Sequence, residues 1–359
     1  MKKTFTLLTF LVITISWGQI PTGYYNSATG TGYVLKTQLA NIIDNHNDRN
    51  YSGLYTTYLT SDKDFYYENN GTLLDMYTEN PTGSECEFTY GINQDDGSGG
   101  TSECDKYNRE HLVPQSVFGS ATPMYSDAHF VVPSDKYVNA QRGDLPFGVV
   151  NVGTNTYSNG SKRGSNLNSG YSSGYTATVF EPIDEFKGDI ARMLLYFATR
   201  YETEVAGWNF TMFNNTSNQV FNSFGINVLL TWSNNDPVSA REIARNNAIY
   251  ARQGNRNPYI DHPEYAMQIW GSLLNTTSYS SLTDVSIYPN PAVNGTIKID
   301  SKKRIDCIEL INVNGQIIQQ IKSPEPQNET YTVNNLPQGF YFLKLTSNNQ
   351  TITKKIVVE

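Results

Sequence analysis

Apolar residues recur at helical spacing in three segments of the chain. In residues 34–46 (VLKTQLANIIDNH), 187–202 (KGDIARMLLYFATRYE) and 238–253 (VSAREIARNNAIYARQ) they fall three and four positions apart, which predicts amphipathic helices. Residues 151–176 are rich in Gly, Ser, Asn and Tyr, which predicts loops and short strands. We therefore expect an α+β fold here. The apolar side of the third helix is predicted to contain Ile243, Ile249 and Tyr250.

The pattern changes at Asp284, after which short β-branched runs alternate with turn residues to the end of the chain. This spacing predicts a small all-β sandwich. The sequences YPNP, VNGQ, LPQGFYFLKL and KKIVV in residues 284–359 resemble the C-terminal sorting domain of the type IX secretion system of Bacteroidetes. The resemblance implies an export tag that engages this machinery and is cleaved at the cell surface. A carbohydrate-binding module is the alternative for this segment.

The first 19 residues have the pattern of a signal peptide. Lys2 and Lys3 precede an apolar run of about 13 residues, Phe5 to Trp17, which is followed by small and polar residues. A spanning helix needs roughly 20 apolar residues, and no other apolar stretch of that length occurs. We therefore expect an exported protein without a membrane span.

Two of the three cysteines are predicted to form a disulfide. Cys86 and Cys104 flank a segment rich in Gly, Asp and Ser, and exported proteins fold in an oxidising environment. Cys307 has no partner within its own segment and is expected to be a buried free thiol, with an intermolecular bridge as the alternative.

Composition and charge limit the functional classes. A chain of 359 residues with 38% hydrophobic residues can form two or three folded domains, which excludes a disordered protein. The net charge is −8, and residues 19–104 hold 12 acidic but only 3 basic residues. Such a body cannot hold a polyanion by charge alone, so binding of nucleic acid would depend on local chemistry in residues 105–165.

The candidate chemistry lies in this segment, which contains two of the four histidines. AHFVVP is predicted to be a strand, Ser134 a helix N-cap, and the following residues a helix that ends at Gly143. With a strand around NREH, this gives a strand, a long loop, a strand and a helix. Such a unit can bring a His from its first strand and an amide from its helix to one point.

The residue types fit the hydrolysis of a phosphodiester. Mg²⁺ prefers oxygen ligands and retains several waters, so Glu110 and Asn139 would suffice as its protein ligands. A neutral His111 can accept a proton from the attacking water. The guanidinium of Arg142 or Arg109 would meet the charge that develops on the phosphate oxygens.

Two further residues are candidates for contact with the substrate. They are His129, for which a hydrogen-bonded structural role is the alternative, and Arg256, for which packing and turn formation compete with phosphate binding. The sequence has no HExxH, zinc-ligand spacing, GxSxG or phosphate-binding glycine loop, which excludes zincins, zinc ribbons, serine hydrolases and P-loop enzymes.

NREHLVPQS and DAHFVVPSDKYVNAQR, in this order, resemble the two signature blocks of the bacterial endonuclease I family. The resemblance extends over roughly residues 20–275 and implies a secreted or periplasmic nuclease of ββα-metal (His-Me finger) fold. It also implies that Glu110 and Asn139 bind the metal, that His111 is the general base, and that DNA and often RNA are cut with little sequence preference. Phe130 departs from the pattern, because members usually carry Asn or His there.

The sequence thus predicts a secreted endonuclease in three parts: a signal peptide (1–19), a nuclease domain (20–283) and a sorting domain (284–359). We expect a monomer with one Mg²⁺ ion, Ca²⁺ and Mn²⁺ being the alternatives, that acts on DNA and RNA. A ribonuclease of the same fold restricted to RNA is one rival hypothesis. A surface binding or adhesion protein with a degenerate site is the other.

Overall fold

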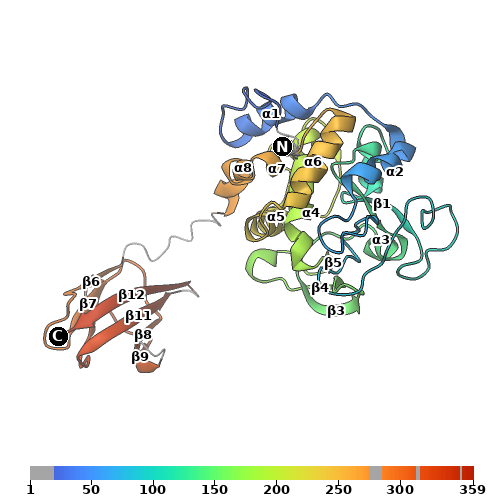
Figure 1. Cartoon of the computed structure of the whole chain (residues 1–359). Helices are drawn as coiled ribbons and strands as arrows, with labels where there is room; N and C mark the ends of the chain where they lie inside the picture. The colour runs from blue at the N-terminus through green and yellow to red at the C-terminus, as the bar shows by residue number, and fades with distance from the viewer. Residues whose placement is uncertain (1–19, 275–284, 313–315, 348–349) are drawn as a thin grey trace, which may run out of the picture. The chain divides into compact units, whose positions relative to one another are not determined.

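The chain divides into two compact units, Met1–Leu274 and Asn275–Glu359, in a computed structural model that describes residues 20–274, 285–312, 316–347 and 350–359 (Figure 1). The predicted signal peptide and the predicted domain boundary at residue 284 lie outside the described residues. None of the helices in the described ranges is long and apolar enough to cross a membrane.

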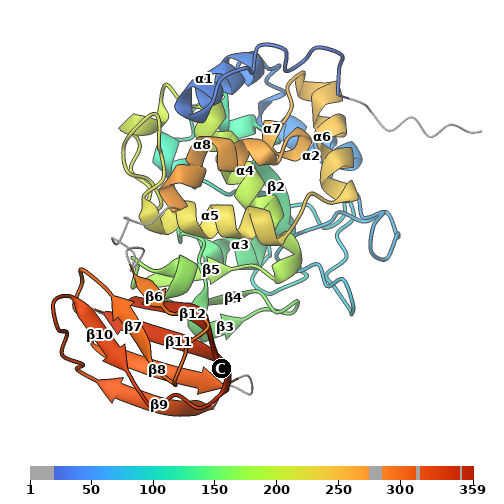
Figure 2. The ribbon, with the colours of Figure 1, turned by 90° about the vertical axis from the view of Figure 1, so that its left-hand side faces the viewer.

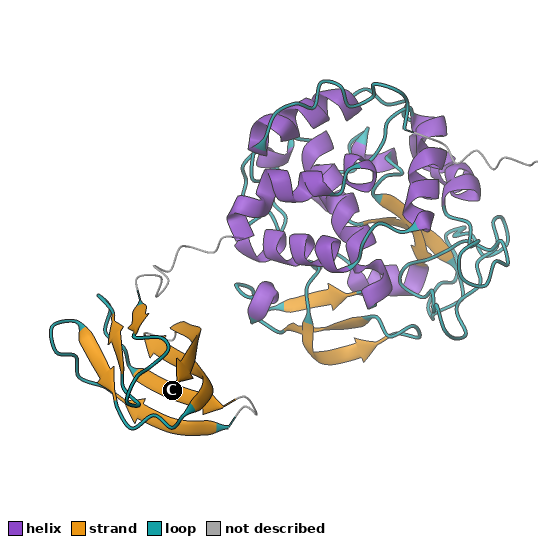
Figure 3. Ribbon diagram, turned by 60° about the vertical axis from the view of Figure 1, so that its left-hand side comes forward, coloured by secondary structure: helices purple, strands orange, loops and turns teal. Residues whose placement is uncertain are grey.

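In the described part of the first unit, helices hold more residues than strands, and the strands gather toward one side (Figure 3). The α-helices of its described residues are α1 (Gly32–Ile43), α2 (Asn50–Ser61), α3 (Lys136–Arg142), α4 (Lys187–Arg200), α5 (Ser223–Asn235), α6 (Ala240–Gln253), α7 (Pro258–Asp261) and α8 (Glu264–Leu274). Helix α4 is the centre of the unit: every residue from Gly188 to Arg200 is buried, and α1, α5 and α7 pack against it (Figure 2).

The three helices predicted from apolar spacing are present as α1, α4 and α6. The predicted apolar side of α6 is confirmed only in part. Ile249 is buried and Tyr250 partly buried, but Ile243 is 40% exposed, whereas Glu242 and Arg245 are buried. Glu242 is held by Arg192 of α4 at 2.5 Å, and Arg245 by Asp62 at 2.7 Å. Apolar spacing identified the helix but not its buried charged residues, because these are held by ion pairs to other elements.

The strand, loop, strand and helix predicted around the motifs are present. β1 (Tyr107–His111) pairs antiparallel with β2 (Val131–Asp135), with Glu110 opposite Val132, and α3 follows directly. The predicted N-cap is wrong by one residue: Ser134 belongs to β2, and the side chain of Asp135 accepts the hydrogen bond from the backbone N–H of Val138. A separate antiparallel sheet contains β3 (Val150–Thr156), β4 (Lys162–Asn166) and β5 (Thr178–Glu181), in the region predicted to hold loops and short strands.

The second unit is all-β, as predicted. One antiparallel sheet has the order β10-β7-β6 and the other the order β12-β11-β8-β9. Their strands are β6 (Ser286–Tyr288), β7 (Ile297–Asp300), β8 (Cys307–Asn312), β9 (Ile317–Lys322), β10 (Thr330–Val333), β11 (Gly339–Ser347) and β12 (Gln350–Val358). Side chains of both sheets form one apolar core, which shares no residue with the core of the first unit.

The predicted disulfide between Cys86 and Cys104 is confirmed, and Cys307 is a free thiol that is only partly buried. The bridge joins Cys86 to Cys104, which lies shortly before β1. The backbone N–H of Cys104 donates to the side chain of Asp135, the N-cap of α3. The disulfide therefore braces the beginning of the strand and helix unit.

Replacing both bridge cysteines with serine should lower the free energy of unfolding by roughly 3 kcal/mol, because the unfolded chain regains the entropy of an open loop. Urea unfolding under oxidising conditions measures this loss. Cys307→Ser is the matched control and should cost much less. An unchanged midpoint in the Cys86→Ser/Cys104→Ser chain would contradict a stabilising bridge.

Candidate active site

A pocket of about 310 Å³ opens where β1 meets α3. Strand β1 contributes Glu110 and His111, and α3 contributes Asn139. The three side chains on which the sequence-based hypothesis depends therefore line one cavity, although they come from segments about 30 residues apart. The remaining residues around it are Tyr51, Asn108, Arg109, Pro114, Gln115, Lys136, Ala140, Gly143 and Asp144.

Glu110 is almost fully buried and held from two sides. Its Oε1 accepts hydrogen bonds from the hydroxyl of Tyr77 at 2.8 Å and from Nη1 of Arg142 at 2.9 Å. Burial raises the pKa of this carboxyl group, while Arg142 and Tyr77 oppose the shift by stabilising the carboxylate. Both side-chain donors use Oε1, and within the described residues Oε2 has no side-chain donor.

His111 lies against a wall of aromatic rings. Its imidazole stacks on Tyr125 with ring centroids 5.3 Å apart, and its Nε2 lies 3.1 Å from the carbonyl oxygen of Tyr125. A carbonyl can only accept, so this contact places the proton on Nε2 and leaves the lone pair on Nδ1. Burial lowers the pKa of His111 to about 4, and the nearby Arg109 and Arg142 act in the same direction. The ring is therefore neutral at physiological pH.

Asn139 is oriented by a second amide. Its Nδ2 donates to Oδ1 of Asn108 at 2.8 Å, and both residues line the pocket. This bond engages the nitrogen of Asn139. Its oxygen accepts no hydrogen bond from the part of the chain that the structure describes, so it remains available as a ligand.

Arg109 supplies a positive charge to the pocket wall. Its guanidinium lies over the ring of Tyr51 at 3.5 Å and that of Tyr55 at 4.2 Å, and its Nη1 donates to the carbonyl oxygen of Tyr51. Nε of Arg109 is buried and lacks a partner among the described residues. Lys136 is also at the pocket, but its ammonium is paired with Asp95 at 2.8 Å. Arg109 is therefore the better placed cation for an anionic ligand.

The structure corrects the role expected of Arg142. Its side chain is 1% exposed, and its guanidinium donates to Glu110 and to the carbonyl oxygens of His111, Leu112 and Leu145. These bonds engage all three of its nitrogens. Arg142 thus fixes the carboxylate and the end of β1 from beneath, and it does not face a phosphate.

The two candidates for substrate contact, His129 and Arg256, lie outside the pocket. His129 lies just before β2 and is 1% exposed. Its backbone N–H donates to the side chain of Asp127, and its Nε2 lies 3.0 Å from the carbonyl oxygen of Asn255. Arg256 is also 1% exposed and forms a bidentate pair with Asp261 at 2.6 and 2.7 Å. Burial and these contacts favour structural roles for both residues.

Sequence reasoning missed the aromatic residues that shape the pocket. Tyr77 positions Glu110, and Tyr51 and Tyr125 stack on each other with centroids 3.9 Å apart beside His111. With 25 tyrosines in the chain, no spacing distinguishes these three from the others.

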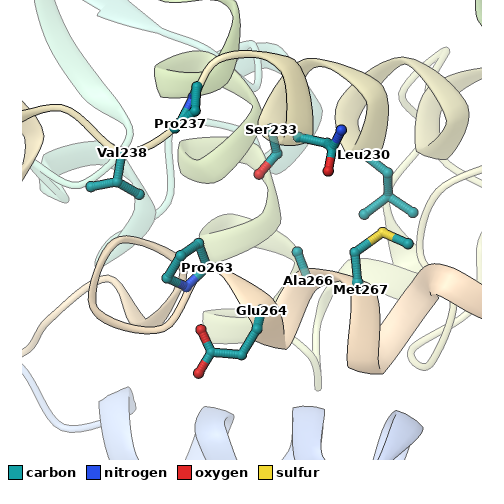
Figure 4. A pocket seen from close by; sticks show the side chains of 9 residues that line it. Leu230, Ser233, Pro237, Val238, Pro263, Glu264, Ala266 and Met267 are labelled. Atoms are coloured by element: carbon teal, nitrogen blue, oxygen red, sulfur yellow. The ribbon is translucent and has the colours of Figure 1, made fainter.

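A second hollow, of about 250 Å³, lies between α5 and α8 (Figure 4). Its wall includes Leu230, Ser233, Ala266 and Met267, and its one titratable side chain is that of Glu264. A single carboxylate beside apolar side chains cannot supply both a general base and the ligands of a metal ion. The pocket at β1 and α3 therefore remains the candidate active site.

The family model for endonuclease I matches residues 31–264, the larger part of the chain. The chain belongs to the endonuclease I family. Two extracellular ribonucleases, from Bacillus amyloliquefaciens and Bacillus subtilis (strain 168), are each 36% identical to this endonuclease I family member over 252 residues, which is 69% of this chain and 78% of theirs. These findings support a secreted nuclease, that is, a hydrolase.

The tail of this endonuclease I family member, residues 286–359, matches the secretion system C-terminal sorting domain. The match identifies the second unit as a sorting domain and not as a carbohydrate-binding module, and it supports export or a cell-surface location. A solved structure of PorZ, a surface component of the type IX secretion system of Porphyromonas gingivalis, is 18% identical and covers 23% of this chain and 12% of its own. Its TM-score of 0.19 is too low to support an argument.

His129 should make the endonuclease unit sensitive to acid. Burial lowers its pKa to about 4, whereas an unfolded histidine titrates near 6.5. The folded state binds this proton more weakly, so the stability present above pH 6.5 is lost as the pH falls toward 4. His129→Gln should reduce the acid-induced loss of unfolding free energy by up to roughly 3 kcal/mol.

Urea unfolding at pH 7 and pH 4 measures this difference. His262→Gln, at a partly exposed histidine beside Glu264, is the matched control and should keep the wild-type pH dependence. The same acid-induced loss in wild type and His129→Gln would show that His129 is not the sensitive group.

Proposed function

We propose that this protein is a secreted, metal-dependent endonuclease that hydrolyses phosphodiester bonds of DNA and RNA with little sequence preference. The observation that carries the proposal is the convergence of Glu110, His111 and Asn139 on one pocket. The succession of β1, β2 and α3 is consistent with the ββα-metal fold that we propose for this unit. Intact placement of all three groups disfavours a degenerate adhesion protein.

The residues present fit a hard divalent cation. Glu110 and Asn139 each have one atom fixed by neighbours and one oxygen left without a side-chain donor among the described residues. Carboxylate and amide oxygens are the ligands that Mg²⁺ prefers, with water and substrate phosphate completing the shell. A Mg²⁺ ion held there would polarise the scissile phosphate and stabilise the departing oxygen; Ca²⁺ and Mn²⁺ are the alternatives.

His111 is proposed to act as the general base. Because Nε2 is engaged by the carbonyl of Tyr125, Nδ1 is the atom that accepts a proton from the attacking water. The new oxygen–phosphorus bond replaces the bond to the 3′ oxygen, which leaves a 5′-phosphate and a 3′-hydroxyl. The aromatic wall of Tyr51 and Tyr125 holds the imidazole in one orientation.

Arg109 is proposed to bind a phosphate of the substrate. Stacking on Tyr51 and Tyr55 fixes the plane of its guanidinium, and Arg109 lines the pocket. A guanidinium held in this way contacts any nucleic acid backbone, which accounts for weak sequence preference. Since few basic residues take part, binding should be modest and its dependence on salt shallow.

Restriction to RNA is the second candidate function. The two Bacillus relatives are named extracellular ribonucleases, and no group at the pocket distinguishes ribose from deoxyribose by its position. This candidate keeps the same site and mechanism and differs only in substrate.

Incubating the purified chain with plasmid DNA and with ribosomal RNA, with and without EDTA, tests the proposal. We expect cleavage of both substrates with Mg²⁺ and loss of both activities with EDTA, because the phosphate is then no longer polarised. Gel electrophoresis over time gives the rates. Cleavage of RNA alone would support the restricted ribonuclease, and cleavage that survives EDTA would contradict a metal-dependent enzyme.

His111→Ala is the matched variant for this assay, and His46→Ala, which alters a histidine outside the pocket, is its control. Losing the base should lower turnover by roughly 10²–10⁴-fold while DNA binding persists. Near-normal turnover of His111→Ala would exclude His111 as the base.

Glu110→Gln should weaken Mg²⁺ binding, because the substitution removes the ligand charge but keeps the side-chain volume. Isothermal titration of the metal in the absence of substrate measures the effect. Asp144→Asn, which removes a carboxylate at the rim of the same pocket, is the control. Equal affinities of Glu110→Gln and wild type would remove Glu110 from the proposed ligands.

A further inference from the structure

Four carboxylates converge in a region of the first unit that the nuclease site does not use. Asp64, Glu68, Glu79 and Glu85 each direct one oxygen to a common point, and these four oxygens lie within 4.8 Å of one another. Asp64 and Glu79 are buried, Glu85 is partly buried and Glu68 is exposed. The cluster therefore opens to solvent on one side only.

Local hydrogen bonds bring the two contributing segments together. The side chain of Asp64 accepts from the backbone N–H groups of Tyr66, Tyr67 and Glu68, which closes a tight loop. Leu73 at the end of this loop forms bridges to both Lys63 and Phe88. Residues 79–88 are thereby held beside residues 63–73.

The burial of Glu79 is not explained by any contact within the described part of the protein. Its side chain is 1% exposed, yet neither Oε1 nor Oε2 has a hydrogen-bond donor among the described residues. A buried carboxylate without donors or a counter-ion costs several kcal/mol, and proteins avoid this by pairing the charge, by protonating it or by coordinating a metal.

Protein cations do not neutralise the cluster. Within the described ranges none of the four carboxylates forms an ion pair with Lys, Arg or His. Lys63, next to Asp64 in the sequence, donates instead to the carbonyl oxygen of Gly71. The positive charge that the cluster needs must come from outside the chain.

We propose that Asp64, Glu68, Glu79 and Glu85 bind one Ca²⁺ ion at a site separate from the pocket at β1 and α3. Ca²⁺–oxygen distances of about 2.3–2.6 Å place opposite ligands about 5 Å apart, in agreement with the spread of the four oxygens. Mg²⁺ prefers a strict octahedral shell at about 2.0–2.1 Å, whereas Ca²⁺ accepts the irregular, carboxylate-rich sets that four acidic side chains form. The partial exposure leaves room for water ligands.

A bound Ca²⁺ ion would also stabilise the turn that positions Glu110 in the candidate active site. Residues Asp75 to Glu79 form a turn in which Asp75 accepts from the N–H of Tyr77 and of Asp135. Tyr77 in turn donates to Glu110. Fixing Glu79 therefore fixes the turn that presents the Tyr77 hydroxyl.

The test uses the full chain with Glu110→Gln, so that it is independent of the proposed nuclease site. Thermal unfolding is followed as CaCl₂ is added, and Tb³⁺ luminescence, sensitised by tyrosine, reports binding directly. We expect Ca²⁺ to raise the melting temperature, with a smaller effect of MgCl₂ at the same concentration. Adding Glu79→Gln should weaken Ca²⁺ and Tb³⁺ binding by about tenfold or more.

Glu68→Gln is the second variant, because its exposed side chain can be changed without disturbing the core, and it should also weaken binding. Glu87→Gln removes an exposed carboxylate from the same segment and is the control that should bind as before. An unchanged melting temperature with Ca²⁺, or an equal loss in Glu87→Gln and Glu68→Gln, would overturn the proposal. The first result would mean that a proton shared by Glu79 and Glu85, and not a cation, neutralises the cluster. The second would mean that the cation responds only to the overall negative charge of the segment.

Discussion

The buried guanidinium of Arg142 is the contact on which the candidate active site depends. Arg142 is the last residue of α3. Its guanidinium donates to the side chain of Glu110 and to the backbone carbonyl oxygens of the next two residues, His111 and Leu112. One side chain thus sets the distance between the helix that carries Asn139 and the strand that carries Glu110 and His111. A buried pair of this kind is costly to break, since removing one partner leaves an uncompensated charge.

Buried polar contacts also organise the helical body around this site. Asp127, just before β2, accepts from the hydroxyls of Tyr196 and Tyr201 on or next to α4 and from the amide of Gln253 at the end of α6. Arg245 of α6 reaches Asp62 after α2. These bonds are directional, so they fix how the helices dock where apolar packing alone would tolerate sliding.

Much of the site could be predicted because two of its groups are neighbours in the chain and the third lies at a fixed place in the helix that follows the next strand. Glu110 and His111 are neighbours, and Asn139 lies one helix turn after Asp135. What the sequence left open depends on tertiary contacts. Arg142, His129 and Arg256 have residue types suited to phosphate and equally to structural roles, and only their burial and partners show that they are engaged within the protein. The polar buried face of α6 was missed for the same reason, because its ion-pair partners lie on other elements. The acidic residues at 64, 68, 79 and 85 follow no known motif spacing, and a fold is needed to unite them.

The two units have separate apolar interiors, with no side chain common to both. Cutting the polypeptide between them would open neither interior to water, so the hydrophobic contribution to the stability of each would be retained. The sorting domain could therefore change in sequence, or be exchanged for another, without any repacking of the nuclease unit.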